Sequence, residues 1–294
     1  MIVTVFTPIY NRAANLNDIY KSLINQTCKD FEWIIVDDGS YDNCRGTFID
    51  IKSKHIDCFN IRFFQKRNGG KHTAINLAVR KAIGELFFIL DSDDSLPNDA
   101  IATVLEEYKY VDGDNAICGV SGLMAHHNGV LVGSSYPKNN LIASSIELRY
   151  KYGVTGDLME VFKTAVLKKF PFPEIKGENF CPEILVWNRI AQEYKLRCFN
   201  KVICYRDYME GGLTSRIVEI RMNSPVATTM CYAEMCKLPI PIISRLKAAI
   251  NYLRFSLCDT QSELITQISM IWYVLFPIAY IMHKIDVCKL HKKH

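Results

Sequence analysis

Four short apolar runs stand out in the first third of the chain. Each is rich in β-branched and aromatic residues and is bounded by polar or turn-forming residues, a pattern typical of strands. The predicted strands cover residues 2–6, 31–36, 60–65 and 85–90.

Between most of these runs, apolar residues recur at the spacing of one helix face. Residues 16–24 and 75–83 show this spacing clearly and residues 41–54 show it more weakly, with Gly84 as the expected C-terminal cap of the second helix. Strands that alternate with helices predict a parallel sheet with helices on both faces, and therefore an α/β fold.

The alternation stops after about residue 111. Residues 123–135 predict a hairpin that turns at Asn128 and Gly129. Residues 177–194 predict a loop that leads into a helix, and after about Arg221 we expect a mainly helical chain.

Polar clusters lie at the ends of all four predicted strands. Because ligands of open α/β sheets bind outside the carboxyl ends of the strands, we expect these clusters to share one site. The candidate residues of this site are Thr7, Pro8, Tyr10, Asp37, Asp38, Asn68, Gly70, Lys71, Asp91, Ser92, Asp93 and Asp94.

The densest acidic cluster runs from Asp91 to Asp94. On an extended strand end, Asp91 and Asp93 would project to one side and Asp94 to the other, because side chains alternate between faces. Two carboxylates on one side, beside a nucleotide diphosphate, can share Mg²⁺ or Mn²⁺, which prefer oxygen ligands. A solvated acidic turn that caps a helix starting near Asn98 is the alternative. The spacing excludes an EF-hand, since Leu96 stands where that loop requires glycine.

The other two clusters also allow two interpretations. Asp37 and Asp38 can accept hydrogen bonds from a base and a ribose, or they can belong to a tight turn built on Gly39. The sequence RNGGKH, residues 67–72, lacks the spacing of a Walker A loop. Its two glycines before a helix would still let backbone N–H groups approach an anion, with Lys71 as the charge partner. A plain strand-to-helix turn is the alternative.

Composition narrows the class of protein without deciding it. The chain has 294 residues, 49% hydrophobic and 22% charged, as in an ordered globular protein, and its net charge of +4 is too small to indicate nucleic acid. The eleven cysteines are odd in number and form no CxxC pair, which favours reduced thiols over a disulfide framework. The first residues have no basic region before their apolar run, and therefore predict a strand rather than a signal peptide.

Basic residues are concentrated in the tail. From Lys237 onward there are eight lysines and arginines and three acidic residues. Residues 244–257 have the pattern of a basic amphipathic helix that lies on an anionic membrane surface. Residues 264–282 carry no charge, are barely long enough to span a bilayer, and precede a positive flank at 284–293. We favour a membrane-bound or re-entrant tail over a full span; a buried helix or a dimer contact is the alternative.

Five stretches taken together resemble the family 2 glycosyltransferases with the GT-A fold. They are TPIYNR, VDDGS, NGGKHTAIN, DSDD and GENFCPEILVWNR, in this order, within roughly residues 1–210. The resemblance implies a Rossmann-like, nucleotide-binding mixed sheet with helices on both faces. It also implies inverting transfer of a sugar from a nucleotide diphosphate donor, most often a UDP-sugar, with Mn²⁺ or Mg²⁺. No QxxRW sequence occurs, which speaks against a processive polysaccharide synthase.

The resemblance assigns roles by position. The strand ends that hold uracil and ribose in the family match Thr7, Pro8 and Asp38. Asp91 and Asp93 match the two acids of the family's DxD, with Asp93 as the expected metal ligand and Asp94 as a second candidate.

Glu183 takes the place of the family's catalytic base. It precedes Trp187 and Arg189, which match the helix that follows the base, but Pro182 replaces the first of two expected acids, so that Glu178 is the alternative base. A carboxylate can accept the proton of a sugar hydroxyl as the bond to the anomeric carbon forms. The metal would offset charge that grows on the departing diphosphate.

We therefore expect a metal-dependent enzyme of three parts: a nucleotide-sugar-binding half at 1–115, an acceptor-binding half at 116–220 and a membrane-associating helical tail at 221–294. Its partners would be a nucleotide-sugar donor, a sugar or lipid-linked acceptor for cell-surface polysaccharide or glycolipid synthesis, and the cytoplasmic face of the membrane. Two other functions stay open. One is a haloacid-dehalogenase-type phosphatase that uses Asp91 and Asp93, although the order of acidic strand ends is wrong for it. The other is a non-catalytic nucleotide-sugar or glycan binder.

Overall fold

The computed structural model describes residues 2–55, 58–206, 216–258 and 267–291. The chain divides into two compact units. Unit 1 comprises Met1–Pro171 and Arg189–Met209, and unit 2 comprises Phe172–Asn188 and Glu210–His294. The unit limits fall at 171, 188 and 209, whereas the limits expected from the sequence are 115 and 220.

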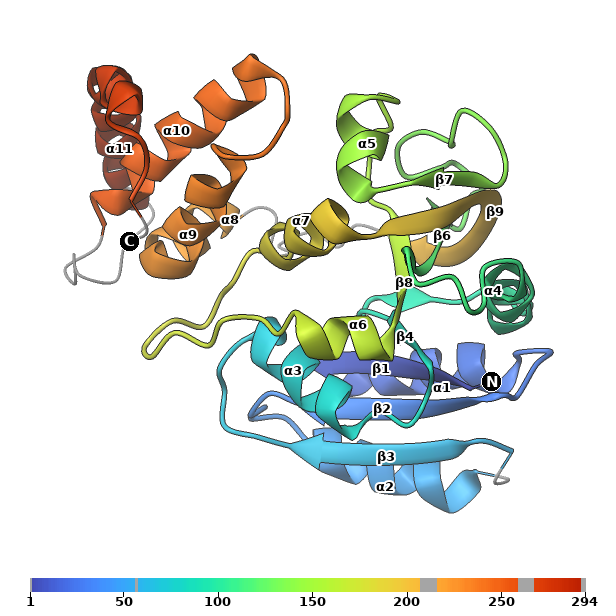
Figure 1. Cartoon of the computed structure of the whole chain (residues 1–294). Helices are drawn as coiled ribbons and strands as arrows, with labels where there is room; N and C mark the ends of the chain where they lie inside the picture. Colours follow the sequence, from blue (N-terminus) through green and yellow to red (C-terminus); the bar gives the residue numbers. More distant parts are fainter. Residues whose placement is uncertain (1, 56–57, 207–215, 259–266, 292–294) are drawn as a thin grey trace. The chain divides into compact units, whose positions relative to one another are not determined.

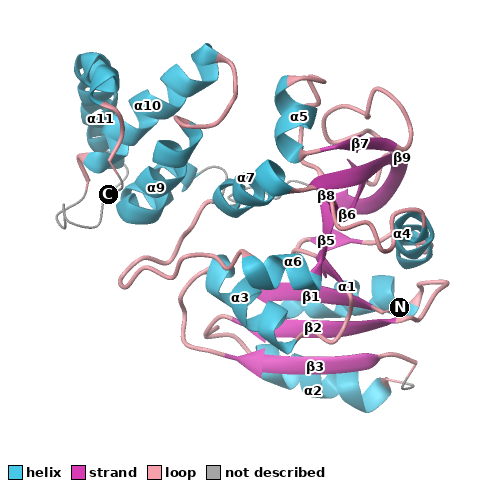
Figure 2. Cartoon of the chain, viewed as in Figure 1, coloured by secondary structure: helices cyan, strands magenta, loops and turns pink. Residues whose placement is uncertain are grey.

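Unit 1 is built on one mixed sheet, whose first half is parallel (Figures 1 and 2). The parallel strands lie in the order β3-β2-β1-β4 and comprise β1 (Val3–Ile9), β2 (Phe31–Asp37), β3 (Asn60–Gln65) and β4 (Leu86–Ile89). All seven residues of β2 are buried, as expected for a parallel strand that is covered on both faces. The four strands confirm those predicted from the apolar runs.

Three helices connect these strands, a fourth follows β4 in the chain, and their apolar faces contribute to the core. They are α1 (Leu16–Ile24), α2 (Cys44–Lys54), α3 (Lys71–Lys81) and α4 (Ala100–Lys109). Leu16, Ile19 and Leu23 of α1 are at most 1% exposed and belong to one core cluster with Trp33 of β2. The helical spacing therefore predicted both the element and its buried face.

The second half of the sheet is mostly antiparallel. It contains β6 (Ile117–Ala125), β8 (Met159–Lys163) and β9 (Lys195–Arg206), with the short strands β5 (Asp94–Ser95) and β7 (Leu141–Ala143) paired to β9. Strand β8 joins the two halves, since it pairs antiparallel with both β4 and β6. Helices α5 (Ser145–Tyr150) and α6 (Thr164–Lys169) flank β8 in the chain. This mixed sheet with its helices confirms the predicted α/β class.

Gly84 is not the helix cap predicted from the sequence. Helix α3 ends at Lys81 and has Ala82 at its C-cap. Gly84 instead lies against β1, where its N–H donates to Thr4 Oγ1 at 3.0 Å and where a Cβ atom would lie 2.4 Å from Thr4 N. The glycine is required by this close approach of two backbone segments.

The predicted hairpin at 123–135 is present but short: Val132 N of its return arm donates to Met124 O of β6 at 2.9 Å. Gly129 has a φ of +85°, as a tight turn at Asn128-Gly129 requires. The return arm carries a single bridge, Ala125 to Leu131, in place of a second strand.

Unit 2 confirms the expected helical tail. Helix α7 (Glu183–Glu193) begins in unit 2, which also contains α8 (Ile217–Met222), α9 (Pro225–Met235), α10 (Ile242–Ser256), the 3₁₀ helix η4 (Met270–Leu275) and α11 (Phe276–His291). Residues 264–266 of the predicted uncharged segment, and Lys292 and Lys293, lie outside the described residues.

The apolar face of α10 does not lie free for a membrane, contrary to the prediction for 244–257. Ala249 and Leu253 are at most 1% exposed and pack in the core of unit 2 with Tyr232 and Ala279. Among the described residues, Met270–Leu290 is the stretch long and apolar enough to cross a membrane by length and composition.

Candidate functional site

The carboxyl ends of the parallel strands lie at one edge of the sheet of unit 1. Asp37 is opposite both Ile9 and Gln65 in the register, and Ile89 is opposite Phe6. The loops that follow these strands therefore start side by side, as the sequence predicts. We call residues 10–12, 37–42, 65–71 and 90–95 the polar rim.

Asp38 ties the loop after β2 to the loop after β3. Its Oδ1 accepts hydrogen bonds from Lys66 Nζ at 2.6 Å and Gly69 N at 3.0 Å. Its Oδ2 accepts from Gly70 N at 2.7 Å and Asn68 Nδ2 at 3.3 Å. The glycine amides that the sequence offers to a phosphate are thus donated to a carboxylate of the chain itself, and Asp38 neutralises the start of α3.

Asp37 shapes the same turn from inside. Its Oδ1 accepts from Ser40 N at 2.8 Å, and its Oδ2 accepts from Gln65 Nε2 at 3.0 Å. Gly39 has a φ of +79°, and a Cβ atom there would lie 2.7 Å from Asn68 N, so the close approach of the two loops requires glycine. VDDGS is therefore a tight turn, and that turn positions the loop after β3.

The site residues predicted at the end of β1 differ in whether their side chains are exposed at the rim. Thr7 is fully buried, and its Oγ1 accepts from Trp33 Nε1 at 3.0 Å, so its hydroxyl is used inside the sheet. Pro8 is half-buried, and Tyr10 is 44% exposed just beyond the strand. Tyr10 thus presents an aromatic ring at the rim, whereas Thr7 does not present its side chain there.

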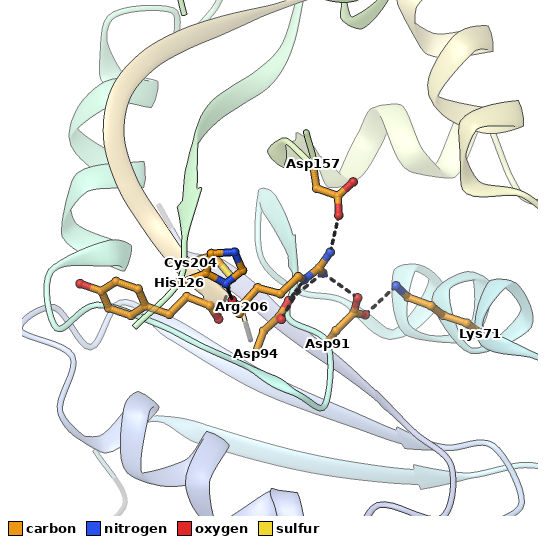
Figure 3. Close-up of polar contacts among 8 residues, drawn as sticks. Lys71, Asp91, Asp94, His126, Asp157, Cys204 and Arg206 are labelled. Carbon is orange, nitrogen blue, oxygen red and sulfur yellow. Dashed lines mark hydrogen bonds and ion pairs between the residues drawn. The ribbon is translucent and has the colours of Figure 1, made fainter. Parts of the chain in front are cut away.

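The acidic stretch after β4 is a turn, not an extended strand end. Strand β4 ends at Ile89, and Asp94 N donates to Asp91 O at 3.1 Å. The predicted alternation of faces is therefore wrong: Asp91 and Asp94, not Asp91 and Asp93, point to a common partner (Figure 3). Ser92 is half-buried, while Asp93 is exposed and has no hydrogen bond or ion pair with the residues that the structure describes.

The common partner is Arg206, the last residue of β9, which was not among the residues predicted from the sequence. Its Nη2 lies 2.8 Å from Asp94 Oδ2 and 3.1 Å from Asp91 Oδ2, and its Nη1 donates to Asp157 at 2.9 Å. The β5–β9 register places Asp94 opposite Arg206, and His126 Nδ1 donates to the Arg206 carbonyl at 2.7 Å. The only sequence signal is an arginine that ends a strand-like run, 112 positions from Asp94.

Lys71, the first residue of α3, holds the other oxygen of Asp91 at 2.6 Å. Burial alone would raise the pKa of Asp91, but Lys71 and Arg206 outweigh it and lower that pKa. For Asp94, burial outweighs Arg206 and raises the pKa. Burial opposes the charge of Arg206, but Asp94 and Asp91 raise its pKa and keep the guanidinium charged. The acidic turn is therefore flanked by two cationic side chains, Lys71 and Arg206, of the kind that bind phosphate oxygens.

The described residues contain no group of three or more His, Cys, Asp or Glu side chains that could hold a metal ion. Both oxygens of Asp94 are within 3.0 Å of Arg206 nitrogens, which leaves the exposed Asp93 as the carboxylate of this turn that fits a divalent cation. One or two carboxylates are enough for Mg²⁺ when substrate phosphates and water complete its shell.

The two candidate bases belong to unit 2. Glu178 is buried, and its oxygens accept hydrogen bonds from Val226 N at 2.6 Å and Ala227 N at 2.9 Å, in the first turn of α9. Its charge thereby stabilises the N-terminus of that helix. Glu183 is half-buried at the first position of α7. The structure gives Glu178 a structural role, and Glu183 stays a predicted base.

A mixed α/β sheet with a charged rim at its parallel strand ends is the arrangement of a nucleotide-sugar-binding GT-A domain. The fold is similar to that in the crystal structure of S. aureus TarS 1-349, with a TM-score of 0.58 at 19% identity over 89% of this chain and 73% of that one. It is also similar to the mannosyltransferase PcManGT from Pyrobaculum calidifontis in complex with GDP-Man and Mn²⁺, with a TM-score of 0.57 at 17% identity over 99% of this chain and 88% of that one.

The chain belongs to glycosyl transferase family 2, whose model matches residues 4–157, just over half of it. An uncharacterized glycosyltransferase of Rickettsia felis is 33% identical over 243 residues, 78% of this chain and 34% of that protein. The GalNAc(5)-diNAcBac-PP-undecaprenol beta-1,3-glucosyltransferase of Campylobacter jejuni is 26% identical over 72% of this chain and 67% of that protein. The chain thus spans about a third of the Rickettsia relative. Membership of this family sets aside the phosphatase alternative.

Proposed function

We propose that this chain is an inverting glycosyltransferase that moves a sugar from a nucleotide diphosphate sugar to an acceptor hydroxyl. The observation that carries the proposal is the meeting of Lys71 and Arg206 with Asp91 and Asp94 at the rim. Two charged donors beside an acidic turn, at the sheet edge where α/β proteins bind nucleotides, suit a diphosphate with its cation. A UDP-sugar is the first donor candidate, supported by the TarS complexes with UDP and UDP-GlcNAc.

In this proposal the rim residues divide the work. Lys71 and Arg206 turn from their carboxylates toward the diphosphate oxygens when the donor binds. Asp93 holds Mn²⁺ or Mg²⁺, and the bound cation offsets the charge of the departing diphosphate. Asp91 and Ser92 face the donor sugar. The nucleotide lies along Pro8, Tyr10 and the two loops that Asp38 joins.

Glu183 is the proposed base. It takes the proton of the acceptor hydroxyl as the new bond to the anomeric carbon forms, because a carboxylate is too weak to remove that proton beforehand. Inversion requires attack from the side opposite the diphosphate. The predicted lipid-linked acceptor is supported by the undecaprenol-linked substrate in the name of the Campylobacter relative, and by the apolar segment Met270–Leu290. Both support action at a membrane, and we propose that it takes place at the cytoplasmic face.

The decisive variant is Glu183→Gln, with Glu178→Gln as the matched control. Glu183→Gln should lower turnover by roughly 100- to 10,000-fold while donor affinity in calorimetry stays the same, because only the proton acceptor is lost. Glu178→Gln should lower the melting temperature instead, because it removes the charge at the start of α9. Turnover is measured as nucleotide released from a panel of UDP-sugars.

Either of two results would change the assignment. Normal turnover in Glu183→Gln would move the base elsewhere. Tight donor binding by the unmodified chain, without nucleotide release from any donor in the panel, would favour the non-catalytic binder.

A further inference from the structure

The segment formed by η4 and α11 carries apolar side chains on a buried side and on an exposed side. One side packs into the core of unit 2, where Ala279 is fully buried beside Trp272 and Leu275. On the other side, apolar residues recur every three or four positions and are between 47% and 78% exposed. This outer stripe consists of Ile271, Val274, Ile278, Ile281 and Ile285.

Unit 2 alone does not explain the outer stripe. A helix on the surface of a soluble protein buries its apolar face and turns polar residues outward. Single exposed apolar residues are common, but a continuous row of them over about four helical turns marks a surface that another apolar body covers.

Charge indicates which body covers the stripe. Between residues 267 and 291, Asp286 is the only acidic residue, and it is buried against Arg254 Nε. The exposed charges beside the stripe belong to Lys284 and Lys289, which line a shallow hollow together with Ile281 and Ile285. An apolar face flanked by lysines suits an anionic lipid surface. A symmetric second copy of the chain would bring these lysines toward each other.

The inner side of α11 decides its orientation. Met270–Leu290 is long enough to span a bilayer, but it includes Lys284, Asp286 and Lys289, whose charges are unfavourable in hydrocarbon. Spanning would also pull Ala279 out of the core and separate Asp286 from Arg254. The helix therefore keeps its inner side on unit 2.

We propose that unit 2 binds an anionic lipid surface through the outer stripe, with α11 in the plane of the membrane and not across it. The proposal deepens the membrane association given under Proposed function, on which it rests, and needs no transferase activity. The stripe sits at the boundary of headgroups and acyl chains, and Lys284 and Lys289 contact lipid phosphates.

Flotation of the full chain with sealed vesicles tests the surface. The chain should float with vesicles that contain phosphatidylglycerol and much less with pure phosphatidylcholine. The double variant Ile281→Lys with Ile285→Lys should lower the lipid partition coefficient at least about tenfold, because two isoleucines no longer enter the lipid. The matched control is Ile49→Lys with Ile83→Lys, which adds the same charge at unit 1 positions that are 56% and 62% exposed. The control should bind like the unmodified chain.

Depth measurements distinguish the plane from a span. The variants Ile278→Trp and Ile285→Trp are each bound to vesicles whose lipids are brominated at known depths. The depth of each new tryptophan is read from the quenching of its fluorescence, after the quenching measured for the unmodified chain is subtracted. In the plane of the membrane, both positions lie at the same shallow depth. Across the membrane, their depths differ by about 10 Å, because seven helical residues rise by 1.5 Å each.

Three results would overturn the proposal. The stripe variant could float as well as the control, or the two tryptophan positions could lie at different depths. Light scattering could also show that the unmodified chain is a dimer and the stripe variant a monomer, with the same flotation for both. In that case a second copy of the chain covers the stripe. Calorimetric UDP-sugar binding should be unaffected by the stripe variant; absent donor binding in the unmodified chain would refute the proposed function and leave the lipid result standing.

Discussion

The two acidic strand ends of unit 1 contain the same residue type but differ in what holds it. Asp37 and Asp38 are at most 4% exposed, and their partners include the backbone amides of Ser40 and of the loop after β3. Asp91 and Asp94 are held by the ends of two long cationic side chains. Backbone partners cannot leave without unfolding the loop, whereas side-chain ends can turn to a ligand. The first pair therefore fixes the shape of the rim, and the second supplies exchangeable charge.

Within these two strand ends, the largest loss of turnover should come from Asp93, the exposed aspartate of the end that also contains Asp91 and Asp94. Asp93→Asn should lower turnover by about 100-fold or more, because the cation that offsets diphosphate charge loses its carboxylate. The melting temperature should stay the same, since the side chain has no hydrogen bond or ion pair with other described residues. Asp112→Asn, at another exposed aspartate, is the control for both measurements. Undiminished nucleotide release in EDTA would refute the metal role.

The next largest effect is a loss of stability at the other acidic strand end, which contains Asp37 and Asp38. Asp38→Asn should lower the free energy of unfolding by about 3 kcal/mol, because it removes a buried charge that Lys66 and two glycine amides bind. For a unit of this size that corresponds to a fall of roughly 6–12 °C in melting temperature. Asp50→Asn, on the exposed side of α2, should leave it unchanged. Normal stability with lost donor binding would mean that Asp38 acts on the donor directly.

The smallest effects are expected for two lysines of the rim, Lys71 and Lys66. Lys71→Met should weaken donor binding about tenfold, because a charge-assisted bond to the diphosphate is lost. It should change the free energy of unfolding by at most about 1 kcal/mol, since Lys71 and Asp91 are 30% and 24% exposed. Lys66→Met should show the reverse, a larger loss of stability and a smaller loss of affinity, because Lys66 binds the buried Asp38. Calorimetry of donor binding and thermal denaturation are measured for both variants. If both lose the same affinity and the same stability, the two lysines do not differ in role.

Local pattern was enough to predict the parallel half of the sheet. The apolar run that became β2 and the helical spacing of Leu16, Ile19 and Leu23 both survive in the structure, because the period of apolar residues that selects a strand or a helix is set by neighbours a few positions away. The same reasoning failed at Asp91–Asp94. Alternation of faces holds for a strand, but the chain had already entered a turn at that point.

The two tail segments show a second limit of prediction from the sequence. Residues 244–257 and 264–282 are both apolar enough to meet lipid, and composition does not say which one the rest of unit 2 covers. In the structure, α10 lies in the core and the outer stripe of η4 and α11 remains exposed. Which apolar face is buried depends on partners that are remote in sequence.

The sequence by itself determined the α/β class, the positions of the four parallel strands and the edge where their polar loops meet, because periodicity and turn residues act over short distances. Only the tertiary structure placed Arg206 on Asp91 and Asp94, gave Asp38 the glycine amides, and made Glu178 the cap of α9. Each of these contacts joins residues at least 30 positions apart. A single sequence does not encode such pairings as a pattern, since they follow from the register of the sheet and from the packing of helices.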